Sequence, residues 1–553
     1  MSVASGLLAA VLLVAVAIPF AHAESGPTQT ELDSAAANAT DWLHTNHDYG
    51  GQRFVDATGI RRQNASELQP TCRYEVGDLY PFHTNPIIYR GVMYLTTPSD
   101  TIALDAATCA LRWRHHWEYK ARANWSQNRG VALKAGTIVR GTRDGYLLAL
   151  DADTGRLLWE RAAGDADKGE TFTMPPVIFD DLVIIGPAGN EVPIKGWVGA
   201  FKLKDGDPVW RFNTIPRPGE PGAESWGATD VLTGGGAVWT PFSLDPAEGL
   251  VFVATGNPAP DFFTDARRGA NLYTSSLVVL DARTGKLVWH HQATPHDLHD
   301  WDLTQVSPLF RADVDGTARR FVSVVGKEGL LRILDRESRA QVTAVAVTRR
   351  QNVEVPVTQE GVYACPGPLG GVQWNGPAFN PRTNMLYVPS VEWCGTFRKA
   401  EKLVHVPGQN YMGGSFQPDA MEQSRGWLTA IDASTGAIRW RYESPRPMLA
   451  AVTVTSADLV FTGELGGDFL VLDAKDGTVV FRYHLGSAMS GGIVTYQVAG
   501  KQYVAVASGS TTRFWRTPPA AATVTIFAIP TPTPGGDSAT PRNETVPSAG
   551  APR

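Results

Sequence analysis

A short pattern that recurs along the chain constrains the fold more than any other feature. Each copy has an apolar run, an aspartate, a turn that usually reads Thr-Gly or Asp-Gly, and apolar residues that end on an aromatic side chain. Asp and Gly favour a tight turn, and the alternating apolar residues favour two half-buried strands. The copies are Ala103 to Trp113, Ala149 to Trp159, Ala200 to Trp210, Val279 to Trp289, a degraded copy from Ile333, Ala430 to Trp440 and Val471 to Phe481.

The spacing of these copies indicates the architecture. They recur roughly every 40 to 50 residues, with longer gaps where loops are inserted, and this period is typical of propeller blades. Four-stranded blades stack into one large closed unit. This outweighs the several domains that the length of 553 residues would otherwise suggest. We therefore predict an all-β propeller whose function lies in the loops between the copies.

The overall composition agrees with this fold and excludes one class of partner. The 16 tryptophans and 55 glycines fit an all-β structure that is rich in turns. The formal net charge is −6, and the sequence contains no basic cluster. Proteins that bind nucleic acid present a positive surface to the phosphate groups, so we do not expect nucleic acid as a partner.

The two ends of the chain differ in composition from the rest. An apolar run from Leu7 to Phe20 is followed by Ala21-His-Ala23, which predicts a signal peptide over residues 1–23. The run is short for a membrane span, and no other apolar stretch reaches about 18 residues. We expect a mature protein without a membrane span, in the periplasm or secreted. Residues 531–553 are rich in Pro, Thr and Ser, which predicts a disordered tail.

Four cysteines, Cys72, Cys109, Cys365 and Cys394, allow three patterns of disulfide pairing. Pairing within each half of the chain, Cys72 with Cys109 and Cys365 with Cys394, needs the least rearrangement of the chain. Disulfides also suit an exported protein. We therefore predict these two bonds.

Three segments between the repeat copies resemble a known enzyme family. They are Val183 to Glu191, ending in Gly-Asn-Glu; Ala254 to Pro260, reading Ala-Thr-Gly-Asn-Pro-Ala-Pro; and Thr294 to Asp302, reading Thr-Pro-His-Asp-Leu-His-Asp-Trp-Asp. With the Trp-ended repeat, they resemble the dehydrogenases that use pyrroloquinoline quinone (PQQ), such as the methanol and ethanol quinoprotein dehydrogenases. Cys365 and Cys394 also match a disulfide of that family.

The resemblance covers nearly the whole mature chain and implies an eight-bladed β-propeller over residues 24–530. Seven repeat copies are legible in the sequence. We therefore expect the eighth blade to be irregular or to be completed by both chain ends, with Thr523 to Ile529 as a late closing strand.

The resemblance implies a metal site and a catalytic base. Glu191 and Asn257 stand at two metal-binding positions of the family. Asp300 falls on the catalytic base, beside the metal, and Asp302 falls where lanthanide-using members add a carboxylate. Hard cations prefer such oxygen ligands, so the expected ion is Ca²⁺ or a lanthanide.

The resemblance also implies a pocket for PQQ, a planar anion with three carboxylates. Trp239 resembles the tryptophan that stacks on the quinone, because a planar ring needs a flat aromatic face. Arg129 resembles the arginine that reaches a cofactor carboxylate. The other positions that match cofactor contacts are Thr142, Lys327 and Asn375.

Several positions depart from the family pattern. His83 stands where relatives have a glutamate that contacts the cofactor, and Ala188 and Ala237 replace a serine and a threonine. Methanol dehydrogenase has two adjacent cysteines over the cofactor, and these positions are Ala123-Asn124 here. These departures affect the substrate and the cofactor affinity more than the class of cofactor.

These residues predict a PQQ- and metal-dependent enzyme that oxidises an alcohol to an aldehyde or ketone. Asp300 would accept the proton of the alcohol while hydride leaves the carbon. Electrons would pass to a separate acceptor such as a cytochrome c, because the chain has no Cys-x-x-Cys-His motif for an attached haem.

Three alternatives remain open at this point. A non-catalytic propeller could use a similar repeat as a scaffold that binds proteins, as the outer-membrane assembly lipoprotein does. A PQQ dehydrogenase for sugars or polymeric alcohols is the second alternative. The third concerns the cluster of His296, Asp297, His299, Asp300 and Asp302, which would also suit a solvated loop or a zinc site, although zinc usually takes a tight set of His or Cys ligands.

Overall fold

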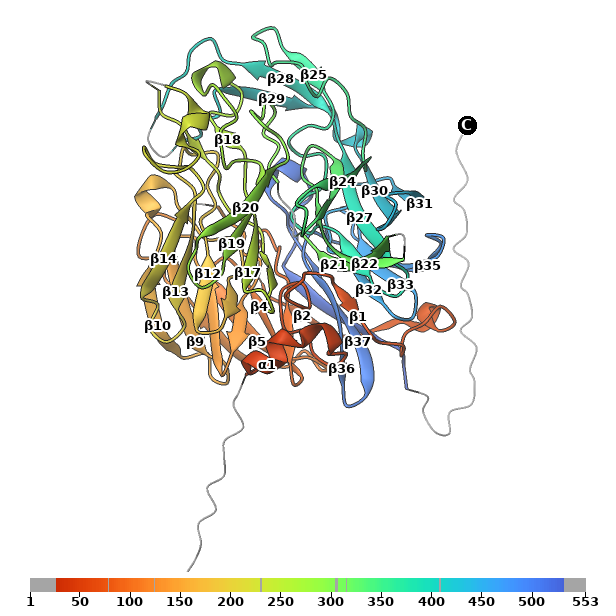
Figure 1. Ribbon diagram of the computed structural model, residues 1–553. Coiled ribbons are helices and arrows are strands. Elements are labelled where there is room, and N and C mark those ends of the chain that lie inside the picture. Colours follow the sequence, from red (N-terminus) through yellow and green to blue (C-terminus); the bar gives the residue numbers. More distant parts are fainter. Residues whose placement is uncertain are drawn as a thin grey trace, which may run out of the picture.

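The computed structural model describes residues 26–531 except 78, 124, 229–230, 304–306, 315 and 407–408. Within these residues, eight sheets contain four or five strands, which is consistent with the expected number of blades. Figure 1 shows the N-terminal segment, in red, beside the C-terminal strands, in blue. The predicted signal peptide lies outside the described residues, as does the predicted tail after residue 531.

The blades follow one another along the chain, and the strands of each blade pair in order. Blade 1 consists of β3 (Ile87–Tyr89), β4 (Val92–Thr96), β5 (Asp100–Asp105) and β6 (Leu111–His116), and blade 2 of β7 (Ala132–Lys134), β8 (Thr137–Gly141), β9 (Tyr146–Asp151) and β10 (Leu157–Ala162). Blade 3 consists of β11 (Val177–Phe179), β12 (Leu182–Ile185), β13 (Trp197–Lys202) and β14 (Pro208–Asn213). Blade 4 consists of β16 (Ser243–Asp245), β17 (Leu250–Ala254), β19 (Ser276–Asp281) and β20 (Leu287–Gln292).

Blades 5 to 8 continue the series, and the last two include strands from the start of the chain. Blade 5 consists of β21 (Leu309–Val314), β22 (Thr317–Val324), β23 (Leu330–Asp335) and β24 (Gln341–Ala346), and blade 6 of β26 (Ala378–Asn380), β27 (Met385–Glu392), β30 (Arg425–Asp432) and β31 (Ile438–Ser444). Blade 7 consists of β1 (Phe54–Val55), β32 (Thr453–Thr455), β33 (Leu459–Gly463), β34 (Asp468–Asp473) and β35 (Val479–His484). Blade 8 consists of β36 (Ile493–Val498), β37 (Lys501–Ser508), β38 (Thr523–Ala528) and β2 (Gln69–Glu75).

Helices contribute little to the described structure. The α-helix α1 (Gln29–Asp33) begins at a capping box, in which Thr28 and Glu31 bond to each other's backbone N–H groups. The 3-10 helices are η1 (Ala35–Ala37), η2 (Ala65–Glu67), η3 (Ala166–Lys168), η4 (Ala223–Trp226), η5 (Thr264–Ala266), η6 (Met421–Gln423) and η7 (Arg513–Trp515). In the part of the chain that the structure describes, no helix is long and apolar enough to cross a membrane.

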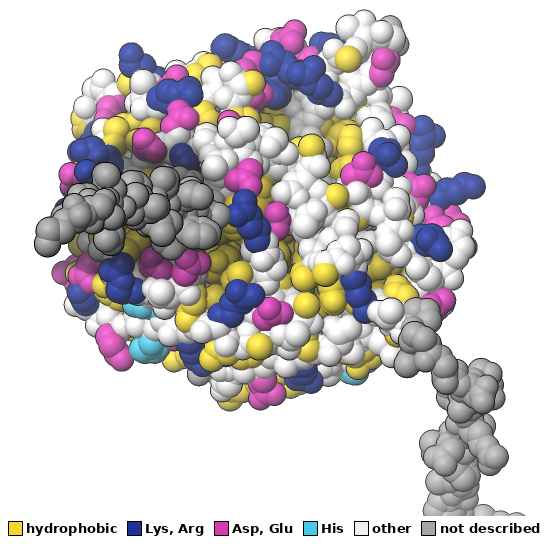
Figure 2. Space-filling model, turned by 90° about the horizontal axis from the view of Figure 1, so that it is seen from below, with side chains coloured by type: hydrophobic (Ala, Val, Ile, Leu, Met, Phe, Trp, Pro, Cys, Tyr) yellow, Lys and Arg dark blue, Asp and Glu magenta, His cyan; other side chains and the backbone are white. Residues whose placement is uncertain are grey.

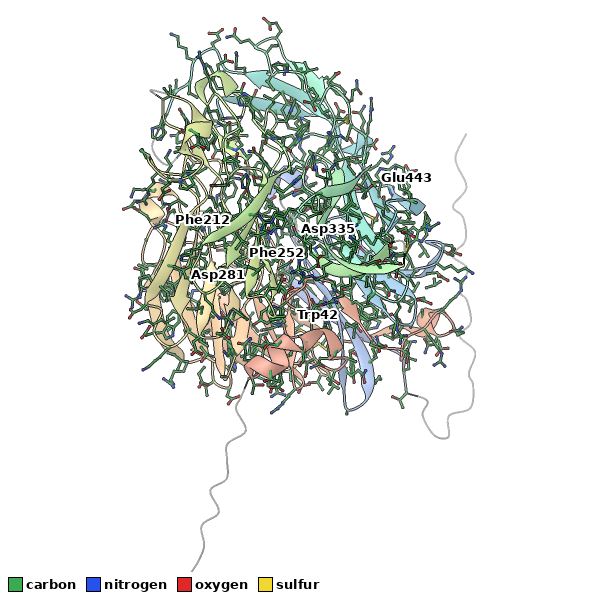
Figure 3. All side chains as sticks on the ribbon, viewed as in Figure 1. Trp42, Phe212, Phe252, Asp281, Asp335 and Glu443 are labelled. Atoms are coloured by element: carbon green, nitrogen blue, oxygen red, sulfur yellow. A yellow bond between two sulfur atoms is a disulfide. The ribbon has the colours of Figure 1, made fainter. Side chains whose placement is uncertain are left out.

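Each repeat copy forms two antiparallel strands joined by a tight turn, as predicted, and these are the last two strands of the repeat's own stretch of chain in each blade. In the second copy, Asp151 Oδ1 accepts hydrogen bonds from the backbone N–H of Thr154 at 2.9 Å and from its hydroxyl at 2.7 Å. Gly155 then adopts a φ of 70°, which glycine reaches without strain. Asp281 and Asp335, labelled in Figure 3, accept equivalent bonds in blades 4 and 5.

The tryptophan that ends a copy joins its blade to the next one. Trp113 Nε1 donates to the carbonyl of Ala152 at 2.9 Å, and Trp159 Nε1 donates to that of Leu203 at 2.9 Å. A Cβ on Gly155 would lie 2.5 Å from the Trp113 ring, so this packing requires glycine. Trp210 and Trp440 make the same kind of bond to the blades that follow them. The repeat therefore specifies the contact between blades as well as the hairpin.

The hydrophobic core lies between neighbouring blades. Its largest cluster joins buried residues of blades 1 to 4 with residues of blade 8, and includes Tyr94, Ile184, Leu280 and Ile526. The outer surface is mixed: on the face seen in Figure 2, Lys and Arg side chains are interspersed with Asp and Glu side chains.

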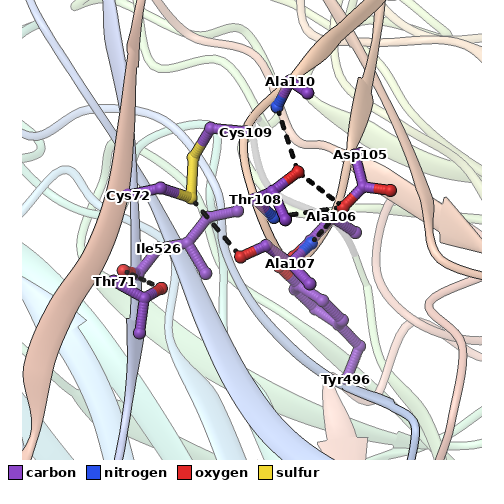
Figure 4. Close-up of a disulfide and its surroundings, with 10 residues drawn as sticks. All are labelled: Thr71, Cys72, Asp105, Ala106, Ala107, Thr108, Cys109, Ala110, Tyr496 and Ile526. Atoms are coloured by element: carbon purple, nitrogen blue, oxygen red, sulfur yellow. Dashed lines mark hydrogen bonds between the residues drawn. A yellow bond between two sulfur atoms is a disulfide. The ribbon is translucent and has the colours of Figure 1, made fainter.

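Both chain ends complete blade 8, which is the second of the two expected outcomes. Strand β2 pairs antiparallel with β38, and Cys72 lies opposite Ile526. The disulfide between Cys72 and Cys109 ties this strand to the turn between β5 and β6 of blade 1 (Figure 4). Cys109 adopts a φ of 61° at the position that glycine occupies in most other copies. The ring of blades is thus closed by hydrogen bonds and by a covalent bond.

Two small sheets outside the blades position the loops of the functional site. Strand β15 (Gly234–Gly235) pairs with β18 (Pro258–Ala259). Strands β25 (Val362–Ala364), β28 (Gly395–Lys399) and β29 (Gly414–Pro418) form a sheet at the top of Figure 1. The disulfide between Cys365 and Cys394, also as predicted, joins the end of β25 to the start of β28.

Candidate functional site

A cavity of about 580 Å³ lies among the loops that follow or precede the blade strands. Its wall contains seven of the ten residues that the sequence predicts for the site, from segments far apart in the chain. They are His83, Arg129, Glu191, Trp239, Asp300, Asp302 and Lys327. The predicted residues Thr142, Asn257 and Asn375 lie outside the wall.

At one end of the cavity, an ammonium group lies between two carboxylates. Lys327 Nζ is 2.6 Å from Asp302 Oδ2 and 3.2 Å from Asp300 Oδ1. Burial lowers the pKa of Lys327, but Asp300 and Asp302 outweigh that effect and raise its pKa overall. Asp300 has a φ of 58°, which is uncommon for a residue other than glycine.

Asn257 reaches this acidic end from behind the wall. Its backbone N–H donates to Asp302 Oδ1 at 2.9 Å, and its side-chain oxygen accepts a bond from Asn190 Nδ2 at 2.8 Å. Asn190 Nδ2 also donates to Asp302 Oδ1 at 2.6 Å. The pairing of β15 with β18 brings Asn257 beside Gly236, whose backbone N–H donates to the Asn257 carbonyl. The next residue, Ala237, donates its backbone N–H to Asn190 Oδ1 at 2.8 Å, which adds the Asn190 segment.

The acidic end holds more carboxylates than the ammonium group of Lys327 can neutralise. Burial, with a contribution from Asp302, raises the pKa of Glu191 to about 7. Burial and then Asp300 raise the pKa of Asp261, whose Oδ2 has no hydrogen-bond partner among the described residues. Burial also raises the pKa of Asp300, and Lys327 opposes this rise. A bound cation would keep these groups ionised.

The donor set fits a hard cation better than zinc. Carboxylate and amide oxygens converge here, which are the ligands that Ca²⁺ prefers. Among the described residues, no three or more His, Cys, Asp or Glu side chains are by themselves arranged to hold a metal. Neither His296 nor His299 is in the cavity wall. His299 stacks on Trp301 with ring centroids 4.3 Å apart, and His296 Nδ1 lies 2.8 Å from the carbonyl oxygen of Gly269.

The other end of the cavity combines aromatic faces with positive charge. The guanidinium carbon of Arg129 lies 4.9 Å from the ring centroid of Trp239 and 5.5 Å from that of Trp374. Arg129 donates to the Thr173 hydroxyl at 3.0 Å, and burial lowers its pKa to about 9. The ring of His83 stacks on Trp374. This aromatic end offers what a planar anion needs.

The three predicted residues outside the wall have partners within the protein. The Thr142 hydroxyl donates to Asp144 Oδ1 at 2.6 Å. The side-chain nitrogen of Asn375 donates to the carbonyls of Leu449 and Ser490 at 2.9 and 3.0 Å. Since Trp374 Nε1 donates to the same carbonyl of Ser490, Asn375 braces an indole that does line the cavity.

Sequence reasoning missed some members of the site. Asn190 lies within a predicted segment, and Asp261 and Trp374 adjoin predicted residues, but none of the three was itself expected to take part. Their position beside Glu191, Pro260 and Asn375 is the signal that could have identified them.

Comparisons with known proteins identify the family of this chain. A family model described as the glucose/ethanol/alcohol dehydrogenase β-propeller domain, of the PQQ type, matches residues 42–350. A second model, of the outer membrane protein assembly factor BamB, matches residues 424–537, which include the last two repeat copies.

Relatives of similar length match most of the chain. The quinohemoprotein alcohol dehydrogenase ADH IIB of Pseudomonas putida is 30% identical over 542 residues, covering 91% of this chain and 78% of the relative. The quinoprotein alcohol dehydrogenase PedH, also of Pseudomonas putida, is 30% identical over 83% of this chain and 84% of its own length. A solved europium-containing methanol dehydrogenase superposes with a TM-score of 0.83, at 26% identity, covering 90% of this chain and 100% of that chain. The chain therefore belongs to the PQQ-type glucose/ethanol/alcohol dehydrogenase family.

Proposed function

We propose that the protein oxidises an alcohol to an aldehyde or ketone, with PQQ and a metal ion held in the cavity. The observation that carries this proposal is the division of the cavity into two ends. One has indole faces beside a buried guanidinium, and the other has buried carboxylates in excess of a single ammonium group. A planar anion and a hard cation match these two ends.

The aromatic end would hold the cofactor. Trp239 and Trp374 present flat faces for its rings, and Arg129 and His83 face its carboxylates. Lys327 also lines the cavity, at the junction with the acidic end. Asn375 acts from behind the wall, because it bonds to the same Ser490 carbonyl as the Trp374 indole.

The acidic end would hold Ca²⁺ or a lanthanide through Glu191, Asn257, Asp300 and Asp302. Bound PQQ and its ion supply the electron acceptor and the Lewis acid of the reaction. The hydrogen bonds from Asn190 and Asn257 fix the direction of the Asp302 carboxylate, so this ligand is oriented before an ion arrives.

Asp300 accepts the hydroxyl proton of the substrate. Its carboxylate faces the cavity, and the ammonium of Lys327 favours its ionised, proton-accepting form. The ion pair with Lys327 Nζ, at 3.2 Å from Asp300 Oδ1, holds the carboxylate in one direction.

A separate acceptor such as a cytochrome c receives the electrons, since the sequence has no motif for an attached haem. The enzyme works in the periplasm or is secreted. The two disulfides support an oxidising compartment, in which such bonds persist.

Reconstitution tests the proposal. Purified protein without cofactor is mixed with PQQ and either Ca²⁺ or a lanthanide, and turnover is followed with a dye acceptor. Small alcohols, sugars and polymeric alcohols are compared as substrates. We expect dye reduction that needs both PQQ and metal and is fastest with a small alcohol. Fastest turnover with a sugar or polymer would favour the second alternative, and no saturable PQQ binding would favour a scaffold.

A further inference from the structure

The imidazole of His83 is buried in the cavity wall, and no described residue bonds to either of its nitrogens. The residue is 1% exposed, and its ring stacks on Trp374 with centroids 4.5 Å apart and planes at 13°. A buried polar atom left unpaired is unfavourable, so a ligand in the cavity that bonds to this ring would remove that penalty.

Arg129, a cation of the same wall, has no anionic hydrogen-bond partner among the described residues either. Arg129 is 2% exposed and bonds to neutral groups, the Thr173 hydroxyl and the carbonyl of Trp239. Its Nε has no hydrogen-bond partner in the described part of the chain. Trp374 touches both groups, since it stacks on His83 and lies 5.5 Å from the guanidinium of Arg129.

We propose that His83 and Arg129 together bind one carboxylate of the cofactor, and that His83 takes up a proton when this carboxylate arrives. The inference rests on the proposed function, because PQQ is the anion concerned. One solvent proton adds to a ring nitrogen, and the resulting imidazolium N–H donates to a carboxylate oxygen. The stacked indole of Trp374 also favours a cation at this position.

The charge balance of the cavity explains why a proton is needed. Lys327 is already engaged by Asp300 and Asp302. Arg129 bonds to neutral groups, and a carboxylate buried beside it is bound more favourably when a second cation lies against it. Protonation of His83 adds one positive charge at the place where the anion binds.

The direction of the pH dependence follows from the environment of His83. Burial and then the charge of Arg129 lower the pKa of His83 well below its ordinary value, so the free protein holds a neutral imidazole. A carboxylate beside the ring raises that pKa in the complex. PQQ binding is thus linked to proton uptake, and affinity increases as the pH falls. The other charged groups of the wall are Glu191, Asp300, Asp302, Lys327, Arg513 and Arg516.

Titration calorimetry of PQQ binding to the full chain loaded with Ca²⁺ tests the inference. Measurements in buffers of different ionisation enthalpy count the protons taken up by wild type, His83→Gln and His83→Phe. Glutamine keeps a hydrogen-bond donor but cannot be protonated, and phenylalanine keeps only the stacked ring. The acidic groups titrate alike in all three proteins, so the difference in proton uptake isolates His83.

We expect wild type to take up more protons than either variant, by about one proton at most. Loss of a hydrogen bond to a charged group should weaken PQQ binding by about ten- to hundredfold in His83→Phe. The wild-type affinity should also rise more steeply than that of His83→Gln as the pH falls from the pKa of His83 in the complex towards its lower pKa in the free protein. His44→Gln is the control: His44 is half-buried and desolvation lowers its pKa to about 4, but it bonds to the carbonyl of Leu32 and is not in the cavity wall.

The outcomes separate this inference from the proposed function. Wild type that binds PQQ with the same affinity and proton uptake as both variants would overturn the role of His83 and leave the proposed function intact. Weaker binding by the variants with unchanged proton uptake would contradict the protonation step. Failure of wild type to bind PQQ would overturn both.

Discussion

Carboxylates at the blade turns and carboxylates in the cavity have opposite surroundings. In the turns, hydrogen bonds from Thr154 lower the pKa of Asp151. In the cavity, burial raises the pKa of Glu191, Asp261 and Asp300, which lie close to one another. The turn carboxylate is thus stabilised by its own hairpin, whereas the cavity carboxylates destabilise the protein until a cation arrives.

Two tryptophans show the same contrast. Trp113 packs on the glycine of the next blade and bonds to a backbone carbonyl, so its surroundings are complete within the protein. Trp239 is only partly buried and presents surface to the cavity. Repeated positions therefore build the fold, and positions outside the repeat carry groups whose partners come from a ligand. Substitutions in the cavity and substitutions in the blades can therefore be used to test these two groups of positions separately.

Asp300→Asn should have the largest effect on the cavity side. The amide keeps the shape of the carboxylate but cannot accept the substrate proton, so kcat should fall by about 10²–10⁴. PQQ binding and the thermal midpoint should stay close to wild type. Steady-state turnover with a dye acceptor measures the loss, and near-normal turnover would move the base to another residue, with Asp302 next.

Trp113→Ala tests the blade side. Loss of a buried indole and its bond to Ala152 should lower the free energy of unfolding by about 3–5 kcal/mol. Denaturant unfolding measures this change, and PQQ affinity of the folded fraction should be unaffected. Leu111→Ala is the matched control, because Leu111 lies in the same strand and is 51% exposed. Equal effects of the two changes would show that the docking tryptophan is not what holds the blades.

Trp239→Ala should reverse that pattern. Removal of a large aromatic contact should weaken PQQ binding by about 1–3 kcal/mol, while the unfolding midpoint of the cofactor-free protein changes little. Quenching of protein fluorescence by PQQ gives the affinity. A drop in stability with unchanged affinity would instead assign Trp239 to packing between blades.

Asp302→Asn tests whether the acidic end discriminates between metals. The amide oxygen still accepts the bonds from Asn190 and Asn257, but a negative charge is lost. A trivalent ion gains more from that charge than Ca²⁺ does. Activity with a lanthanide should therefore fall about tenfold more than activity with Ca²⁺. Equal losses with both metals would make Asp302 a structural residue.

The fold could be predicted from the sequence because its determinants are local. The Asp, the glycine and the tryptophan of a copy such as Ala149 to Trp159 lie within one hairpin, and the next copy supplies the surface on which the tryptophan docks. The disulfide pairs followed from the same short-range reasoning.

The site was less predictable because its contacts join distant segments. Asn190 bridges Asn257 and Asp302, and no local pattern reports such a contact. Thr142 and Asn375 were expected to face the cofactor, but the side chain of each donates a hydrogen bond to a neighbouring residue of the protein. The resemblance located the segments, and three-dimensional packing decided which side chain of a segment faces the cavity.

Asp151→Asn should have the smallest effect on stability. The direction of the pKa shift of Asp151 predicts how this effect changes with pH. Hydrogen bonds from Thr154 lower the pKa of Asp151 in the folded state, so its ionised form stabilises the fold above the unfolded pKa of about 3.9. That stabilisation is lost as the pH falls through the lower, folded-state pKa. The free energy of unfolding of the variant should therefore be about 1 kcal/mol lower than that of wild type at neutral pH. The two proteins should be equally stable when the pH is below both the unfolded and the folded pKa of Asp151. Thermal unfolding at several pH values measures the difference, with Asp181→Asn, whose side chain is 96% exposed, as the control. A deficit that persists in acid would mean that the turn depends on the shape of the side chain and not on its charge.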